Sequence, residues 1–152
     1  MSIEQDIKQE QFASPYHKLV INIAFTNGYL TNLLNNYLKP YGISMQQYNV
    51  LRILRGQHPN PVSINSITDR MIDKNSNASR LVEKLRIKSL IGRSQCPEDK
   101  RQVDVCITTK GLEVLSEIDK IMTDYDKHFS HLNVSDVELA NSVLDDLRLG
   151  NI

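Results

Sequence analysis

The sequence predicts a mainly α-helical fold of the α+β class, in which one β-hairpin lies among longer helices. Over most of the 152 residues, apolar side chains recur at steps of three and four, which is the spacing of one helix face. After Leu90 the period changes to two, and 91–96 and 103–108 are typical of strands. The charged segment 97–102 between them contains Pro97, so the two strands form a hairpin.

The N-terminal part predicts a polar tail over 1–14, followed by one long helix. Ser14 is a preferred capping residue, and Pro15 suits the first position of a helix. The apolar periodicity continues to about Leu38 and stops before Pro40. At about 1.5 Å per residue this helix would be about 36 Å long, which predicts more than one packing partner.

Two capping signals predict the next helices. Ser44 and Gln47 form a capping box before the apolar stripe Val50-Leu51-Leu54, and that helix ends near Gly56. After the turn-rich segment 58–61, a short helix is expected with its cap at Ser63. Its inward face is predicted to hold Ile64, Ile67, Met71 and Ile72.

A tight connection at 73–75 leads into a further short helix. Asn75 is one of the few non-glycine residues that tolerate a left-handed backbone, and Ser76 is expected to start the helix. Its buried stripe is predicted to be Ala78, Leu81, Val82 and Leu85. Two short helices joined by a tight turn and followed by a hairpin make a winged helix-turn-helix over 44–108, with a two-stranded wing.

The C-terminal part predicts two more amphipathic helices. One runs from about Thr109 to Phe129, and Ser135 with Glu138 forms a capping box for the last one. The last helix is expected to bury Ala140, Val143, Leu144 and Leu147. The apolar stripes of 15–43 and 109–152 are wider than one small winged domain covers, so these segments are interpreted as a helical dimerisation region.

The distribution of charge indicates where an anionic partner would bind. The whole chain has a net charge of zero, but residues 74–101 carry eight basic and three acidic side chains. Residues 111–152 carry nine acidic and three basic ones. The positive field is therefore concentrated on the second short helix and the hairpin, which favours double-stranded DNA as the partner.

In helix-turn-helix motifs the second helix enters the major groove, and its N-terminal half faces the base edges. Here the outward side chains are Ser76, Asn77, Ser79 and Arg80, with Lys84 one turn further on. Arginine bridges the two acceptors of guanine, and asparagine pairs with adenine. Lys84, Arg86 and Lys88 are expected to face phosphates. At the hairpin tip, Lys100 and Arg101 suit a narrow minor groove.

These motifs resemble those of the MarR family of bacterial and archaeal regulators over nearly the whole chain. The resemblance is carried by Gly42-Ile43-Ser44 with Gln47 and Val50-Leu51, by Ser79-Arg80-Leu81-Val82-Glu83-Lys84-Leu85, by Asp99-Lys100-Arg101, and by Ile107-Thr108-Thr109-Lys110-Gly111. It implies a homodimeric transcriptional regulator, expected to repress from a pseudo-palindromic operator. It also implies that Arg101 probes the minor groove, and that Asp99 braces the wing through a basic residue such as Arg80.

Two positions depart from the family pattern. Ser89 stands where the family usually has glycine, so it must accept a left-handed backbone or let the helix end differently. Lys100 replaces the first of two wing arginines, which keeps the charge but loses the bidentate geometry.

The family resemblance also suggests a small aromatic or anionic effector. It would bind between the dimer helices and the winged helix-turn-helix, called the reading head. Tyr16, His17, Tyr41, Tyr48 and Arg52 are the candidate lining residues. Each is equally ordinary at an edge where helices pack, so the existence and identity of an effector stay open.

The cysteines and histidines are interpreted as having ordinary structural roles. Cys96 and Cys106 are interpreted as unbridged thiols rather than a redox sensor, and no metal or other cofactor is expected from the four histidines, His128 and His131 included. The sequence shows no arrangement of side chains that is typical of a catalytic site, such as a nucleophile with its base. No signal peptide or membrane span is expected, which favours the cytoplasm. The alternative to a DNA-binding regulator is a winged module that binds protein.

Overall fold

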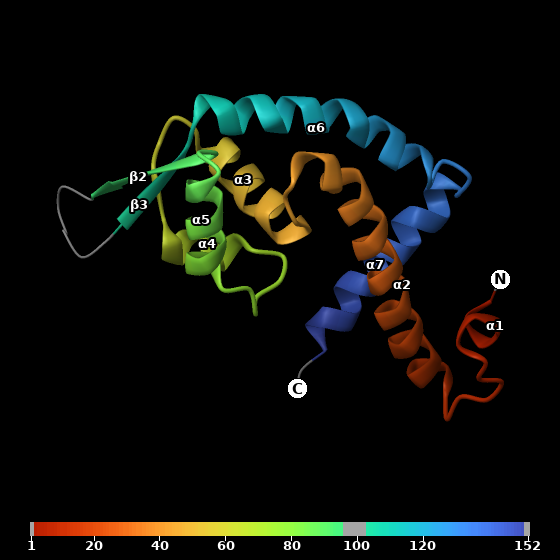
Figure 1. The fold of residues 1–152 in the computed structure, drawn as a ribbon. Coiled ribbons are helices and arrows are strands. Elements are labelled where there is room, and N and C mark those ends of the chain that lie inside the picture. The colour runs from red at the N-terminus through yellow and green to blue at the C-terminus, as the bar shows by residue number, and fades with distance from the viewer. Residues whose placement is uncertain (1, 96–102, 151–152) are drawn as a thin grey trace. The chain divides into compact units, whose positions relative to one another are not determined.

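Helices make up most of the structure, a computed structural model that describes residues 2–95 and 103–150 (Figure 1). In chain order the elements are α1 (Ile3–Ile7), α2 (Pro15–Leu38), the 3-10 helix η1 (Lys39–Tyr41), α3 (Met45–Gln57), β1 (Val62–Ser63), α4 (Ile64–Arg70), α5 (Ala78–Ile87), β2 (Ile91–Gln95), β3 (Val103–Ile107), α6 (Thr109–Lys127) and α7 (Val134–Leu149). Contacts divide the chain into two compact units between Leu115 and Ser116, and α6 crosses the division.

Capping residues set the starts of three helices where the sequence predicts them. The hydroxyl of Ser14 accepts the amide of His17, and the hydroxyl of Ser63 accepts the amide of Ser66. Ser44 and Gln47 form the expected reciprocal capping box. The same chemistry produces α1 inside the segment interpreted as a tail, because Ser2 forms a capping box with Gln5.

The core of the first unit lies where α3, α4 and α5 pack with the sheet. Leu51, Ile67, Val82, Leu85 and Val105 are fully buried there. β1, β3 and β2 form an antiparallel sheet in that order, with Val62 opposite Val105. Since β1 has two residues, it offers no period that a sequence pattern can reveal. The paired strands β2 and β3 project from this body as the wing (Figure 1).

The turn between α4 and α5 differs from the sequence prediction. α5 begins at Ala78 with Asn77 as its cap, and Ser76 stands outside the helix. The carboxylate of Asp73 accepts the amide of Asn75 and the hydroxyl of Ser76, both at 3.0 Å. Because these bonds close the turn, Asn75 needs no left-handed backbone and has none, so that prediction was wrong.

A second correction concerns the inward face of α4. Ile67 and Met71 are buried as expected, but Ile72 is 76% exposed. The helix ends at Arg70, so the backbone turns away before Ile72 and the helical period no longer applies.

Ser89 adopts the left-handed backbone, with φ = 60°. The amide of Leu90 donates to the carbonyl of Leu85, and the amide of Ser89 donates to that of Arg86. These two bonds are the Schellman arrangement that ends many helices, with serine at the position usually held by glycine.

The second unit consists of the rest of α6 together with α7. Asn133 precedes α7, so Ser135 lies inside the helix and the capping box predicted there was wrong. α6 ends two residues before Phe129. No residue of α7 is buried, and so the predicted burial of Ala140, Val143, Leu144 and Leu147 is not found in the single chain.

In the part of the chain that the structure describes, no helix combines the length and the apolar character needed to cross a membrane.

Candidate nucleic-acid interface

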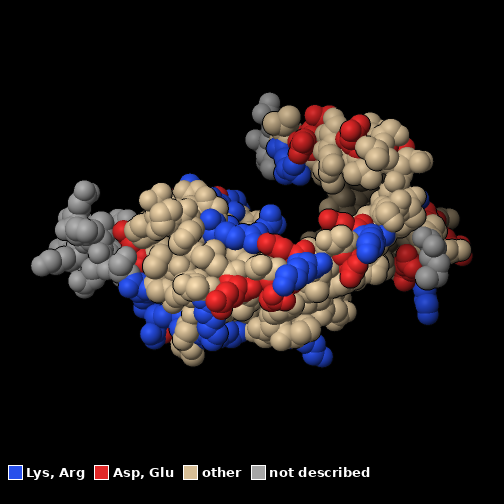
Figure 2. Space-filling view, turned by 90° about the horizontal axis from the view of Figure 1, so that it is seen from above, with Lys and Arg blue, Asp and Glu red and all other residues tan. Residues whose placement is uncertain are grey.

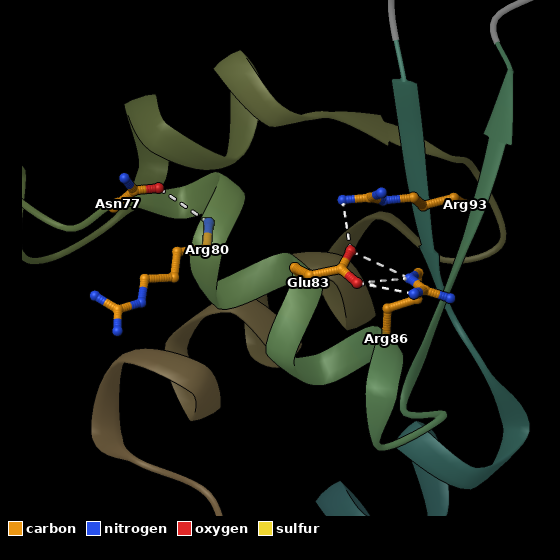
Figure 3. A network of polar contacts seen from close by, with 5 residues as sticks. All are labelled: Asn77, Arg80, Glu83, Arg86 and Arg93. Carbon is orange, nitrogen blue, oxygen red and sulfur yellow. Dashed lines mark hydrogen bonds and ion pairs between the residues drawn. The ribbon is translucent and has the colours of Figure 1, made fainter.

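The N-terminal half of α5 presents polar and basic side chains to solvent. Asn77, Ser79, Arg80 and Lys84 are all exposed, as the sequence predicts. Among the described residues, neither Arg80 nor Lys84 forms a hydrogen bond or ion pair through its side chain. Arg80 points away from the polar network on the other side of the helix (Figure 3). Both cations are therefore available to an anionic partner.

Asn77 and Ser76 are partly engaged by their own backbone region. The side-chain oxygen of Asn77 accepts the amide of Arg80 at 2.9 Å and so caps α5. Its amide nitrogen is the group left for an external acceptor. The hydroxyl hydrogen of Ser76 is donated to Asp73 within the turn. The DNA contacts of Asn77 and Ser76 stay predictions. Each residue has fewer side-chain atoms left for DNA than the sequence suggests, because one of them bonds within the chain.

A hollow of about 330 Å³ lies beside α5. α3, the turn and α5 all contribute to its lining, which consists of Gln46, Asp73, Ser76, Asn77, Arg80, Leu81 and Lys84. Four of these seven residues are predicted DNA contacts. Gln46 is a lining residue that the sequence analysis missed, because its position in α3 does not indicate that it lies near α5.

On the opposite side of α5, Glu83 joins the helix to the wing (Figure 3). Its carboxylate accepts hydrogen bonds from the guanidinium of Arg86, the shortest at 2.8 Å, and lies 3.0 Å from the guanidinium of Arg93 on β2. The hydrogen bond from Arg86 lowers the pKa of Glu83, and the positive charges of Arg86 and Arg93 add to this effect. The three-residue spacing of Glu83 and Arg86 was a readable signal that the sequence analysis did not use.

Two cations predicted to face phosphates have partners within the chain, and their phosphate contacts stay predictions. Arg86 is paired with Glu83, and the ammonium of Lys88 donates to the carbonyl of Gly42 and, at 3.4 Å, to the side chain of Gln47. Both lie at the C-terminal end of α5 and stay exposed to solvent, but there they also reach Glu83 and the segment before α3. Of the three, Lys84 alone has no partner among the described residues.

Asp99, Lys100, Arg101 and Cys96 lie outside the described residues, so their predicted roles stay predictions. The register of the hairpin is described up to Gln95 opposite Val103. Cys106 lies opposite Gly92 and is half-buried, with its sulfur 3.9 Å from the carbonyl oxygen of Gly92.

The candidate effector residues do not all come together in one chain. Tyr16 and His17 lie at the start of α2, and Tyr41 follows its end, so about 36 Å of helix separates them. Tyr48 and Arg52 are in contact, with the guanidinium 5.8 Å from the ring centre. Tyr16 is 80% exposed, whereas Tyr48 is buried.

Within 2–95 and 103–150, no three His, Cys, Asp or Glu side chains gather as metal ligands would. Along α6 acidic and basic residues pair, as Glu117 does with Lys120 and Asp124 with Lys127. Figure 2 looks down onto the side that carries α6 and shows both signs intermixed there.

Comparisons with known proteins agree with this geometry. Residues 43–103 match the family model described as the MarR family. The transcriptional regulator MhqR of Bacillus subtilis is 25% identical over 84% of this chain and 87% of its own length. The regulator SarZ of Staphylococcus aureus is 26% identical over 74% of this chain and 72% of its own.

Among solved structures, a mutant MarR from E. coli complexed with operator DNA has a TM-score of 0.79. It is 23% identical and matches 91% of this chain and 99% of its own, so this likeness concerns the fold. The likeness confirms the predicted winged helix-turn-helix fold, and the sheet of this chain contains a third strand, β1. The relatives are named as transcriptional regulators and not as enzymes. Residues 43–103 thus match the MarR family, and the chain has the winged helix-turn-helix fold of solved MarR structures.

Proposed function

We propose that the protein is a homodimeric repressor that binds a pseudo-palindromic DNA duplex through α5. The observation that carries the proposal is the exposed Arg80, which has no side-chain partner among the described residues and stands on the helix half that reads bases in such motifs. A guanidinium in this situation is free to bridge the two acceptors of a guanine. The mutant MarR of E. coli, a protein of similar fold, was crystallised with operator DNA.

Exposed apolar faces support the dimer. On α2, Tyr16, Val20 and Tyr29 are 80%, 56% and 56% exposed. On α7, Val134 and Leu149 are 74% and 75% exposed. A monomer rarely leaves so many large apolar side chains in water on two helices. A second copy that covers them would place two α5 helices on successive major grooves, about 34–36 Å apart.

The remaining parts of the proposal rest on the sequence. Lys100 and Arg101 would enter the minor groove from the wing, with Asp99 bracing it. A small aromatic anion would release the protein from DNA by binding between the dimer helices and the reading head. Because Tyr16 and Tyr41 are far apart in one chain, such a site needs residues from both copies. To regulate, the ligand must bind one of the two conformers more tightly.

The test of DNA binding starts from duplexes selected from the source genome by the purified protein. Arg80→Ala should weaken binding to the selected duplex about 10- to 100-fold and binding to unrelated duplexes little, since a bidentate base contact is worth about 1–3 kcal/mol. Arg55→Ala near the C-terminal end of α3 is the control, because Arg55 lies outside α5, the wing and the helices proposed to form the dimer.

The salt dependence of the affinity and the oligomeric state in solution complete the test. Affinity should fall steeply as salt rises, because phosphate contacts release counterions. No DNA binding at any salt concentration would favour the protein-interaction module instead. Analytical ultracentrifugation that shows a stable monomer at micromolar concentration would contradict the dimer.

A further inference from the structure

The hollow beside α5 contains a side chain from a different helix. Gln46 belongs to the first turn of α3 and lines the hollow together with Arg80 and Lys84. It is half-buried, and its carboxamide makes no hydrogen bond to any residue that the structure describes. A carboxamide placed in this way keeps its two N–H donors for an external acceptor.

The charges around the hollow suit an anion. Arg80 and Lys84 are positive and unpaired among the described residues, and Asp73 is the one acid in the lining. The carboxylate of Asp73 is already held by the amide of Asn75 and the hydroxyl of Ser76, each at 3.0 Å. One positive charge therefore remains in excess, next to neutral donors.

A backbone phosphate of DNA has the chemistry that these groups recognise. It is anionic and has only acceptor oxygens, which take hydrogen bonds from lysine and glutamine side chains as well as from arginine. With about 330 Å³ the hollow has room for a phosphate group. Because Arg80 also extends toward the base edges in the proposed binding mode, Lys84 and Gln46 are the two donors left for the phosphate.

We propose that Gln46 and Lys84 together hold one backbone phosphate in this hollow, so that α3 as well as α5 sets the position of the protein on the duplex. This inference rests on the DNA-binding function proposed above. α3 is well placed for the task, because its capping box is tied to the end of α5 by Lys88. A phosphate held between α3 and α5 would fix the depth of α5 in the groove without reading sequence.

The first experiment compares Gln46→Ala with Gln57→Ala on selected and unrelated duplexes. Gln57 is the matched control, since it lies on the last turn of α3 and bonds to the carbonyl of Gly56. Gln46→Ala should weaken binding about tenfold on both kinds of duplex, because a hydrogen bond to a charged group is lost irrespective of sequence. Gln46→Glu should weaken binding further, since it places a carboxylate beside the phosphate.

A second experiment identifies the phosphate. Neutral methylphosphonates are introduced one at a time along the selected duplex. At one position per half-site the wild-type protein should lose affinity, and there Gln46→Ala should cause almost no additional loss, because the two changes remove the same contact. Circular dichroism and thermal melting of each variant establish that the fold is retained.

The outcomes separate this inference from the function on which it rests. If the wild type binds no duplex, both are overturned. If Arg80→Ala weakens binding but Gln46→Ala does not, only the phosphate contact is wrong. A loss confined to the selected duplex would overturn it as well, since it would show that Gln46 reads a base. Additive losses at every methylphosphonate position would also contradict it.

Discussion

Replacing Ser89 by glycine should stabilise the protein. Ser89 has φ = 60°, a left-handed conformation that costs a residue with a Cβ about 1–2 kcal/mol. Glycine removes this cost but loses about 0.5–1 kcal/mol through the greater freedom of the unfolded chain. The expected net gain in the free energy of unfolding is therefore about 0.5–1 kcal/mol.

The neighbours of Ser89 keep this strain in place. The hydroxyl of Thr108 donates to the carbonyl of Ser89 at 2.9 Å, and the ammonium of Lys110 donates to the carbonyl of Lys88 at 3.0 Å. Together with the two Schellman bonds, they hold the backbone whatever side chain is present. Ser89→Ala is the matched control, because it keeps the Cβ and removes a hydroxyl for which no bond to a described residue is found.

The assay is urea unfolding at fixed protein concentration, since the stability of the proposed dimer would depend on concentration. Ser89→Gly should raise the midpoint without changing the slope, and should raise Tm by about 1–4 °C. Ser89→Ala should stay within about 0.5 kcal/mol of the wild type. The reasoning is refuted if glycine destabilises the protein, or if alanine and glycine have the same effect.

Two further changes test the junction of α5, the wing and α6. Gly111→Ala should destabilise by about 3 kcal/mol or more in urea unfolding, because the new Cβ would lie 2.2 Å from the carbonyl oxygen of Leu90. Gly56→Ala in α3, where the new Cβ meets nothing within 4 Å, should cost nothing, and an equal loss in both variants would contradict the argument. Glu83→Gln should weaken the bond to Arg93 and speed amide exchange of β2 near neutral pH. Because the pKa of Glu83 is lowered in the folded state, its contribution is present above its ordinary pKa and is lost as pH falls through the lowered value. The stability difference between wild type and Glu83→Gln should therefore shrink below about pH 4, and an unchanged difference there would argue against the ion pair.

The sequence predicted the helices best where a local signal marks their start. Ser14, Ser44 and Ser63 each accept an amide three residues on, and such bonds depend on nearby residues alone. The period change after Leu90 predicted β2 and β3 for the same reason. Where two cap residues compete, as Ser76 and Asn77 do, local chemistry does not decide which one starts the helix.

The sequence also determined which face of α5 is exposed to solvent. The buried stripe of Ala78, Val82 and Leu85 leaves the face that carries Arg80 and Lys84 in solvent. Helical periodicity is enough for this conclusion, because a stripe that is buried on one side requires an exposed face on the other.

Only the tertiary structure decided which of the basic side chains are free. Glu83 takes Arg86 and Arg93, and the carbonyl of Gly42 takes Lys88, although Gly42 is far away in the sequence. Gln46 likewise meets the reading helix only because α3 packs against α5. Helical periodicity indicates which face of a helix is exposed to solvent. The partner of a basic side chain depends on long-range packing, which a local sequence pattern does not predict.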